Sequence, residues 1–223
     1  MTIENTSAVR LKLQEALEGL IKKIDKVQIG TKDQFPFGWR TAGKGRSVWR
    51  ILEELITQNL QAHGHGFGMT RLTMPVGEVS VYDFEIHLNG FENSIFVNVK
   101  SALDGAFTSK DDISKGKGLL KFYEATPSHE LFIATINLKF NDDMSVSLVG
   151  VTVMPTAWLP DLYVNPSNNG NLQSSKYKDV AHATKRTNVE FVAELQKAVD
   201  KADQKKIDKA KNVAVKKVTI VLK

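Results

Sequence analysis

Residues 81–100 read VYDFEIHLNGFENSIFVNVK, and this stretch decides the fold. Polar and apolar residues alternate over 79–88, and a second run with the same period covers 94–101, which is typical of β-strands. The pair Asn89-Gly90 between the two runs is the commonest sequence for a type I′ hairpin turn. The sequence therefore predicts a β-hairpin whose two strands lie in one sheet.

The predicted hairpin carries a group of polar side chains. Asp83 and Glu85 share one face of the first strand, and Asn98 and Lys100 share one face of the second. Carboxylate oxygens bind Mg²⁺, and a neighbouring lysine can stabilise a phosphate or an attacking water. The same residues also fit a cross-strand ion pair on an exposed sheet. We favour the functional interpretation because the strand that ends at Lys100 is strongly apolar.

Outward from this hairpin, the hydrophobic periodicity defines the remaining elements. Helices are predicted over 8–25, 47–62, 111–124 and 188–211, and strands over 130–139, 145–154 and 218–222. The polar stretch 165–178 is predicted to be a loop. This order predicts an α/β fold with a central mixed β-sheet flanked by helices, and a length of 223 residues suits one domain over 1–223.

The composition excludes several classes of protein. The chain has no cysteine, which excludes disulfides, cysteine-ligated zinc, iron–sulfur clusters and thiol catalysis. No apolar run approaches the roughly 20 residues of a membrane span, and the N-terminus lacks the pattern of a signal peptide. We therefore expect a cytoplasmic protein without a membrane partner. The formal net charge of +5 permits a nucleic-acid partner.

Basic residues gather in two segments. In residues 26–46, lysines and arginines that include Lys44 and Arg46 alternate with aromatic residues, which suits a phosphate-lined groove or a surface loop pinned by its aromatics. Residues 201–223 form a basic C-terminal extension with eight lysines against two aspartates. This extension suits either contact with DNA phosphates or a solvated helix face.

Tyr82-Asp83 followed by Asn98-Val99-Lys100 resembles the signature of the PD-(D/E)XK nuclease superfamily. Over residues 36–179 the chain is also similar to EcoRV-like type II restriction endonucleases. The motifs that carry this resemblance keep the same order: Pro36-Phe37-Gly38, Tyr82-Asp83-Phe84, Val97 to Lys100, Thr108 to Asp112, Gly116 to Phe122, and Tyr177-Lys178-Asp179.

The resemblance implies a restriction-endonuclease-like fold and a function. The protein would be a homodimer that hydrolyses phosphodiester bonds of duplex DNA at a short palindromic site, with Mg²⁺ as cofactor and Mn²⁺ as a substitute. Asp83 would be the central metal ligand, Asn98 the second, and the Val99 carbonyl a third. Lys100 would orient the attacking water. An acidic residue of the second helix completes such sites, and Glu53 lies one turn from the matching position.

The sequence departs from the family at Asn98, where the signature has Asp or Glu. Glu85 could replace the missing carboxylate from the face of Asp83, or the neutral oxygen of Asn98 could suffice. A third explanation is a catalytically impaired DNA-binding protein that keeps the nuclease fold. A DNA repair nuclease that recognises structure is a further alternative.

DNA-binding residues are predicted in three places. Lys44, Arg46 and Lys110 would contact phosphates. The loop that begins at Asn165 is rich in amides and poor in charge. Without the resemblance this composition favours a flexible surface loop, and with the resemblance it suits base readout. Its candidate residues are Asn165, Ser167, Asn168, Asn169, Gly170 and Asn171.

Overall fold

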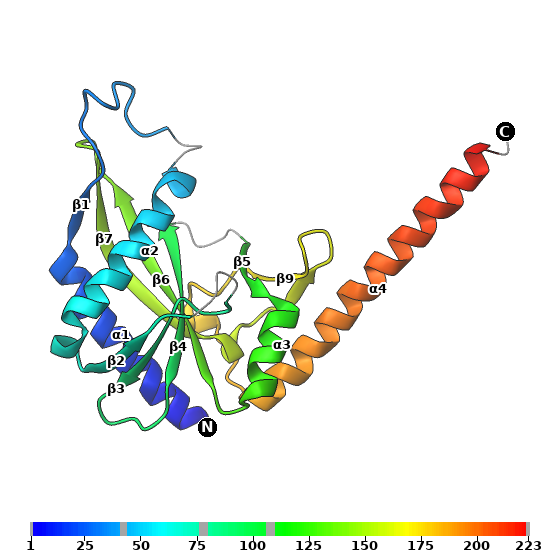
Figure 1. Cartoon of the computed structure of the whole chain (residues 1–223), viewed down its shortest axis with the longest axis horizontal. Coiled ribbons are helices and arrows are strands. Elements are labelled where there is room, and N and C mark those ends of the chain that lie inside the picture. The colour runs from blue at the N-terminus through cyan, green and yellow to red at the C-terminus, as the bar shows by residue number, and fades with distance from the viewer. Residues whose placement is uncertain (1, 41–43, 76–79, 106–109, 222–223) are drawn as a thin grey trace.

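The computed structural model describes residues 2–40, 44–75, 80–105 and 110–221, but not the side chains of residues 44–47 and 212–221. Its centre is a six-stranded sheet in the order β1-β7-β6-β4-β3-β2 (Figure 1). β4 runs parallel to β6, and the other pairs are antiparallel. The strands are β1 (Lys26–Gln28), β2 (Met69–Thr73), β3 (Phe84–Leu88), β4 (Ile95–Leu103), β6 (Glu130–Phe140) and β7 (Ser145–Pro155).

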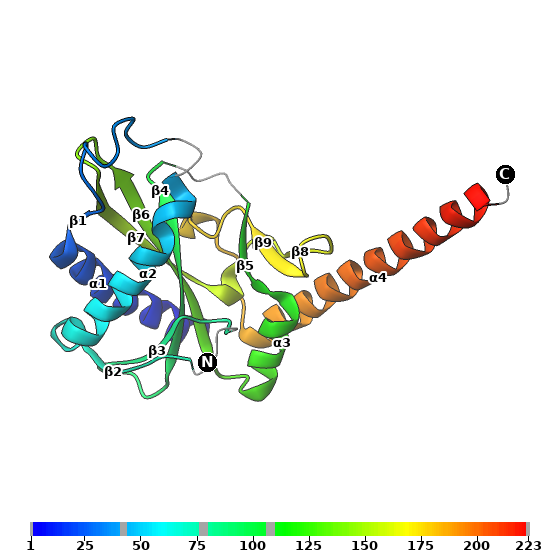
Figure 2. The same ribbon diagram turned by 45° about the horizontal axis from the view of Figure 1, so that its top comes forward.

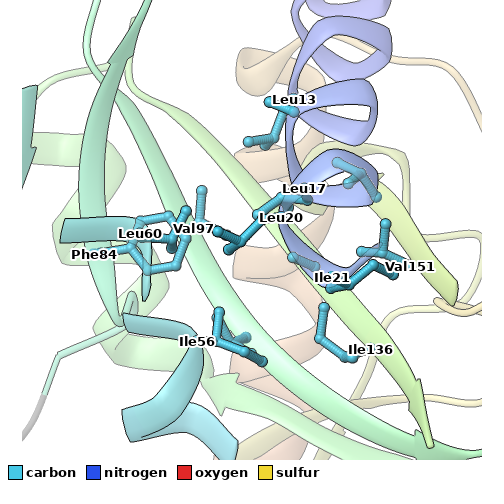
Figure 3. Packing of buried hydrophobic residues seen from close by; sticks show 14 of the residues in the cluster. Leu13, Leu17, Leu20, Ile21, Ile56, Leu60, Phe84, Val97, Ile136 and Val151 are labelled. Carbon is cyan, nitrogen blue, oxygen red and sulfur yellow. The ribbon is translucent and has the colours of Figure 1, made fainter. Parts of the chain in front are cut away.

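Two helices cover one face of this sheet. They are α1 (Ile3–Ile24) and α2 (Lys44–His63). Figure 3 shows that their leucines and isoleucines pack against strand side chains such as Val97 and Ile136. All of these side chains are buried, and each contributes about 1.5–3 kcal/mol relative to an exposed position. This face therefore holds the larger of the two hydrophobic clusters.

The other face carries a smaller second layer. It consists of α3 (Gly116–Ala125), α4 (Asn188–Val221) and a three-stranded sheet in the order β5-β9-β8. The strands are β5 (Asp111–Lys115), β8 (Tyr163–Asn165) and β9 (Asn171–Ser174), and short 3-10 helices lie at Gly64–Phe67, Thr156–Trp158 and Val180–His182. Trp158, Tyr123 and Phe191 are fully buried in this layer. The α/β fold with a central mixed sheet flanked by helices is thus confirmed.

α4 packs against this layer through its first turns alone. Phe191, Leu195, Val199 and Ala202 are buried at helical spacing, and the following residues up to Lys211 are exposed or half-exposed. Figures 1 and 2 show the rest of α4 projecting away from the body. The edge strand predicted over 218–222 is wrong for residues 218–221, because α4 continues through Val221. Residue 222 lies outside the described part of the chain. No helix among the described residues is long and apolar enough to cross a bilayer.

Three further predictions of local structure are wrong. The strand predicted over 79–88 begins at Phe84, and Asn89 has no positive φ, so the turn after Leu88 is not type I′. Residues 111–115 form β5 and not a helix, because they pair with β9. Gly116 begins α3, and its N–H donates to the Gly170 carbonyl at 2.9 Å.

Glu130, the first residue of β6, predicts a pH dependence of stability. Its side chain is 2% exposed and accepts a hydrogen bond of 3.0 Å from the Thr6 hydroxyl. Burial raises the pKa of Glu130 from 4.5 to about 7. The folded state therefore holds this proton more tightly than the unfolded state, so the free energy of unfolding falls as pH rises from 4.5 to 7.

Glu130→Gln removes this titration and can keep the contact with Thr6. We expect it to raise the free energy of unfolding above pH 7 by about 2–4 kcal/mol and to flatten the pH profile below it. Urea denaturation at several pH values measures both effects. Glu15→Gln on the exposed side of α1 is the control, and an unchanged profile in Glu130→Gln would contradict the prediction.

Candidate active site at the open edge of β4

Asp83 lies where β3 and β4 stop pairing. The last pair in the register of these two strands is Phe84 with Val97, and beyond it β4 pairs with β6 but with no other described strand. The Asp83 N–H donates to the Val97 carbonyl at 2.8 Å, and the Asp83 carboxylate accepts the Val99 N–H at 2.6 Å. Two backbone contacts therefore fix Asp83 on the open edge of β4.

Val99 and Lys100 follow on the same strand. The N–H and C=O of one residue point to the same side of a strand, so the Val99 carbonyl faces the edge that Asp83 occupies. Lys100 is half-buried, and its charge lowers the pKa values of both Asp83 and Glu53. The structure thus brings Asp83, Val99 and Lys100 together, as the sequence predicted for them.

Glu53 approaches from α2, which packs over β4. Burial, followed by repulsion from Asp83, raises its pKa to about 7, against the attraction of Lys100 and Arg50. Burial also raises the pKa of Asp83, although the Val99 N–H and Lys100 oppose this shift. Two desolvated carboxylates from different elements therefore share one site with a lysine, and a bound cation would relieve their repulsion.

A divalent metal fits this site only with help from a substrate. Among the residues that the structure describes, no three His, Asp or Glu side chains gather where they could hold a metal. Mg²⁺ commonly uses one or two carboxylates and completes its shell with water and substrate phosphates. Asp83 and Glu53 supply two carboxylates, and the Val99 carbonyl a further oxygen, which suits weak binding of this kind.

Asn98 is built into the fold. It is 7% exposed, and its Nδ2 donates to the carbonyls of Val81 at 3.0 Å and Ile113 at 3.4 Å. Its Oδ1 is buried and has no hydrogen-bond partner among the described residues. The amide thus ties β4 to the segment before β3 and to β5, and it keeps one free oxygen that could bind a cation.

Glu85 has different neighbours. It lies in β3 opposite Phe96, and after burial its charge is the second cause of the raised pKa of Tyr82. Phe84, on the other face of β3, is buried in the cluster under α1 and α2. Repulsion from Asp83 is the second cause, after burial, of the raised pKa of Glu53.

The predicted DNA-binding loop is an ordered hairpin. β8 and β9 pair antiparallel, with Asn165 opposite Asn171, and Ser167 to Gly170 form the turn between them. The Lys110 ammonium lies 4.6 Å from the centre of the Tyr163 ring on this hairpin. Lys44 and Arg46 lie in the first turn of α2, where the side chains are outside the described part of the chain.

Sequence reasoning missed two residues near these sites. Arg50, one turn before Glu53, opposes the rise in the pKa of Glu53 that burial and Asp83 cause. Asp112 accepts hydrogen bonds from three side-chain amides of the β8–β9 hairpin, one in its turn and two in β9. Its signal in the sequence was weak, because a helix was predicted there and the pairing of β5 with β9 spans about sixty residues.

Comparison with known proteins adds little to this geometry. No family model and no curated protein matches the chain. Among solved structures, the chain is similar to NlaIV restriction endonuclease, with a TM-score of 0.43 and 13% sequence identity. This match covers 72% of the present chain and 74% of the other. We therefore base the functional proposal on the side chains of the site.

Asn98→Asp should destabilise the protein at neutral pH. An ionised aspartate has no N–H to donate, so its oxygens would face the carbonyls of Val81 and Ile113. We expect a loss of about 1–3 kcal/mol in the free energy of unfolding, measured by urea denaturation without divalent metal.

Asn89→Asp, the same change in an exposed turn, is the matched control and should be close to neutral. Equal stabilities of Asn98→Asp and the unmodified protein would show that the two carbonyl contacts of Asn98 contribute nothing.

Proposed function

We propose that the protein is a magnesium-dependent DNA endonuclease of the restriction type. The observation that carries the proposal is the Asp83 carboxylate, which the Val99 N–H holds at 2.6 Å on the open edge of β4, next to Lys100 on the same strand. Glu53 supports it, because after burial the charge of Asp83 raises its pKa and that of Lys100 opposes the rise. Two carboxylates and a lysine at one desolvated point suit hydrolysis of a phosphodiester, because that reaction needs a cation for the phosphate and a positioned water.

Each residue has a distinct role in this proposal. Asp83 and Glu53 hold Mg²⁺, with the Val99 carbonyl and the Asn98 oxygen as further candidates. The metal, when bound, supplies Lewis acidity to the phosphate and lowers the pKa of bound water. Lys100 stabilises the negative charge that develops on the phosphate oxygens and orients the attacking water. Mn²⁺ can take the place of Mg²⁺ because both prefer oxygen ligands.

The proposed substrate is duplex DNA with a short palindromic site. The β8–β9 hairpin offers amides for base edges, and Lys110 beside it suits contact with a phosphate. A palindromic DNA site has two-fold symmetry, which a homodimer shares, so we propose a homodimer as the active form.

Asn98 favours a second candidate function. A neutral residue at this position leaves the metal with one carboxylate fewer than the nuclease signature provides, and no cluster of three acidic or histidine side chains forms among the described residues. The second candidate is therefore a DNA-binding protein that keeps the nuclease fold without cutting. Activity with metal separates the two.

Digestion of unmethylated phage DNA by purified protein tests the proposal. We expect discrete fragments with Mg²⁺ or Mn²⁺ and none with EDTA. Lys100→Ala should slow cleavage by roughly 100- to 1000-fold, because it removes the charge that faces the developing oxyanion. Asp83→Ala should abolish cleavage.

Lys139→Ala, on an exposed position of β6, is the control for Lys100→Ala and should cut normally. Salt-sensitive DNA binding with no cutting in either metal would support the second candidate function. Neither binding nor cutting would refute both.

A further inference from the structure

The carboxylate of Asp112 in β5 gathers three amides around itself. Its Oδ2 accepts hydrogen bonds from the Nδ2 of Asn168 at 2.7 Å and the Nδ2 of Asn171 at 3.0 Å. Its Oδ1 accepts one from the Nε2 of Gln173 at 2.7 Å. Hydrogen bonds to an ionised acceptor are about twice as strong as those between neutral groups, so the Asp112 carboxylate holds the three amides firmly in place.

The backbone explains why these side chains meet. Asp112 lies opposite Gln173 in the pairing of β5 with β9, and Asn171 is two residues from Gln173 on the same strand face. The turn itself is held by Asn169 and Gly170, which both have positive φ angles, at 52° and 73°. The Gly170 carbonyl also accepts the N–H of Gly116. The hairpin is therefore fixed at its tip as well as at its base.

The three contacts set the direction of each amide. An amide has an NH₂ donor on one side and an oxygen acceptor on the other, so an amide that donates to Asp112 turns its oxygen away from it. The oxygen of Gln173 is used inside the hairpin, because it accepts the Asn165 amide at 3.3 Å. No described residue donates to the oxygens of Asn168 and Asn171, which remain available to a ligand.

Positive charge lies beside this pair of oxygens. Lys110 packs on Tyr163 at the start of β8, and the Nζ of Lys206 in α4 would lie 4.0 Å from a β-carbon at Gly170. Figure 2 shows the small sheet beside the first half of α4. In duplex DNA the phosphates lie beside the base edges. Lysines next to uncharged amide oxygens therefore suit duplex DNA, because the lysines can contact phosphates while the oxygens face the bases.

We infer that Asp112 is a positioning residue for base recognition: it orients Asn168 and Asn171 so that their oxygens accept the exocyclic amino group of cytosine or adenine. These amino groups are the donors that the major groove displays. The inference rests on the proposed function, since it assumes that the hairpin contacts duplex DNA.

Asp112→Asn tests the inference with little change in size. An asparagine has one oxygen and one NH₂, so it cannot accept from all three amides, and the ionised acceptor that fixes the directions of Asn168 and Asn171 is lost. Asp200→Asn is the matched control, because Asp200 is an exposed carboxylate that also accepts an amide, from Gln196, but it lies on α4. Both variants remove one negative charge and should raise general DNA affinity similarly.

The readout is the sequence preference of binding. A duplex library with a randomised segment is selected on each protein in EDTA, so that cleavage is not needed, and thermal unfolding confirms that the variants fold. We expect the unmodified protein and Asp200→Asn to share a preference for cytosine or adenine at one position or more of each half-site. Asp112→Asn should lose this preference by roughly tenfold or more.

Methylated bases test the chemistry of the contact. N4-methylcytosine or N6-methyladenine at the preferred position should weaken binding of the unmodified protein and leave binding of Asp112→Asn nearly unchanged. An identical preference in Asp112→Asn, with selective binding by the unmodified protein, would overturn the inference and leave the nuclease proposal standing. Absence of DNA binding by the unmodified protein would overturn both.

Discussion

The candidate site depends on one hydrogen bond, from the Val99 N–H to the Asp83 carboxylate at 2.6 Å. β3 leaves β4 at this point, so the edge of β4 would otherwise expose backbone groups inside a mostly apolar sheet. Asp83 satisfies the donor and thereby fixes its own carboxylate at the edge. The same carboxylate therefore accepts the hydrogen bond of a buried backbone N–H and supplies an acidic side chain to the candidate site.

The electrostatics of the site follow from burial around this contact. Desolvation raises the pKa values of both Glu53 and Asp83, and each would be more stable beside a cation. Lys100 and Arg50 oppose the rise in the pKa of Glu53, but burial and then Asp83 outweigh them and raise it to about 7. A divalent ion and the phosphate that accompanies it would complete the balance in the proposed nuclease.

The sequence predicted the four inner strands of the central sheet because they carry a clear period, and it missed the short edge strands β1 and β2. β6 and β7 were predicted within one residue at each end. Asp83 and Lys100 were placed on neighbouring strands by the strand pattern, and Val99 was added by the resemblance alone. β5 was predicted as a helix, since its five residues are stabilised by pairing with a distant strand. Residues 165–178 were expected as a loop because β9 within them is likewise stabilised by pairing with a distant strand, and Asp112, which binds its amides, was missed.

The acidic partner of Asp83 shows the limit of strand patterns. Alternation placed Glu85 on the face of Asp83, but Asp83 lies before the first residue of β3 and is held by β4. Glu53 comes from a helix thirty residues earlier, so no strand pattern links it to Asp83, and the sequence analysis named it through the resemblance alone. Asn98 likewise has a structural role that its residue type alone did not indicate, because its amide satisfies two carbonyls from other segments.

The most direct test of the central claim is the binding of Mn²⁺ by calorimetry, with and without duplex DNA, in the cleavage-deficient Lys100→Ala background. Two carboxylates make an incomplete site that a phosphate completes, so we expect Mn²⁺ to bind more tightly to the protein–DNA complex than to the free protein. Asp83→Ala in the same background should lose this difference. Equal metal affinity with and without DNA, or metal binding that survives Asp83→Ala, would contradict the account.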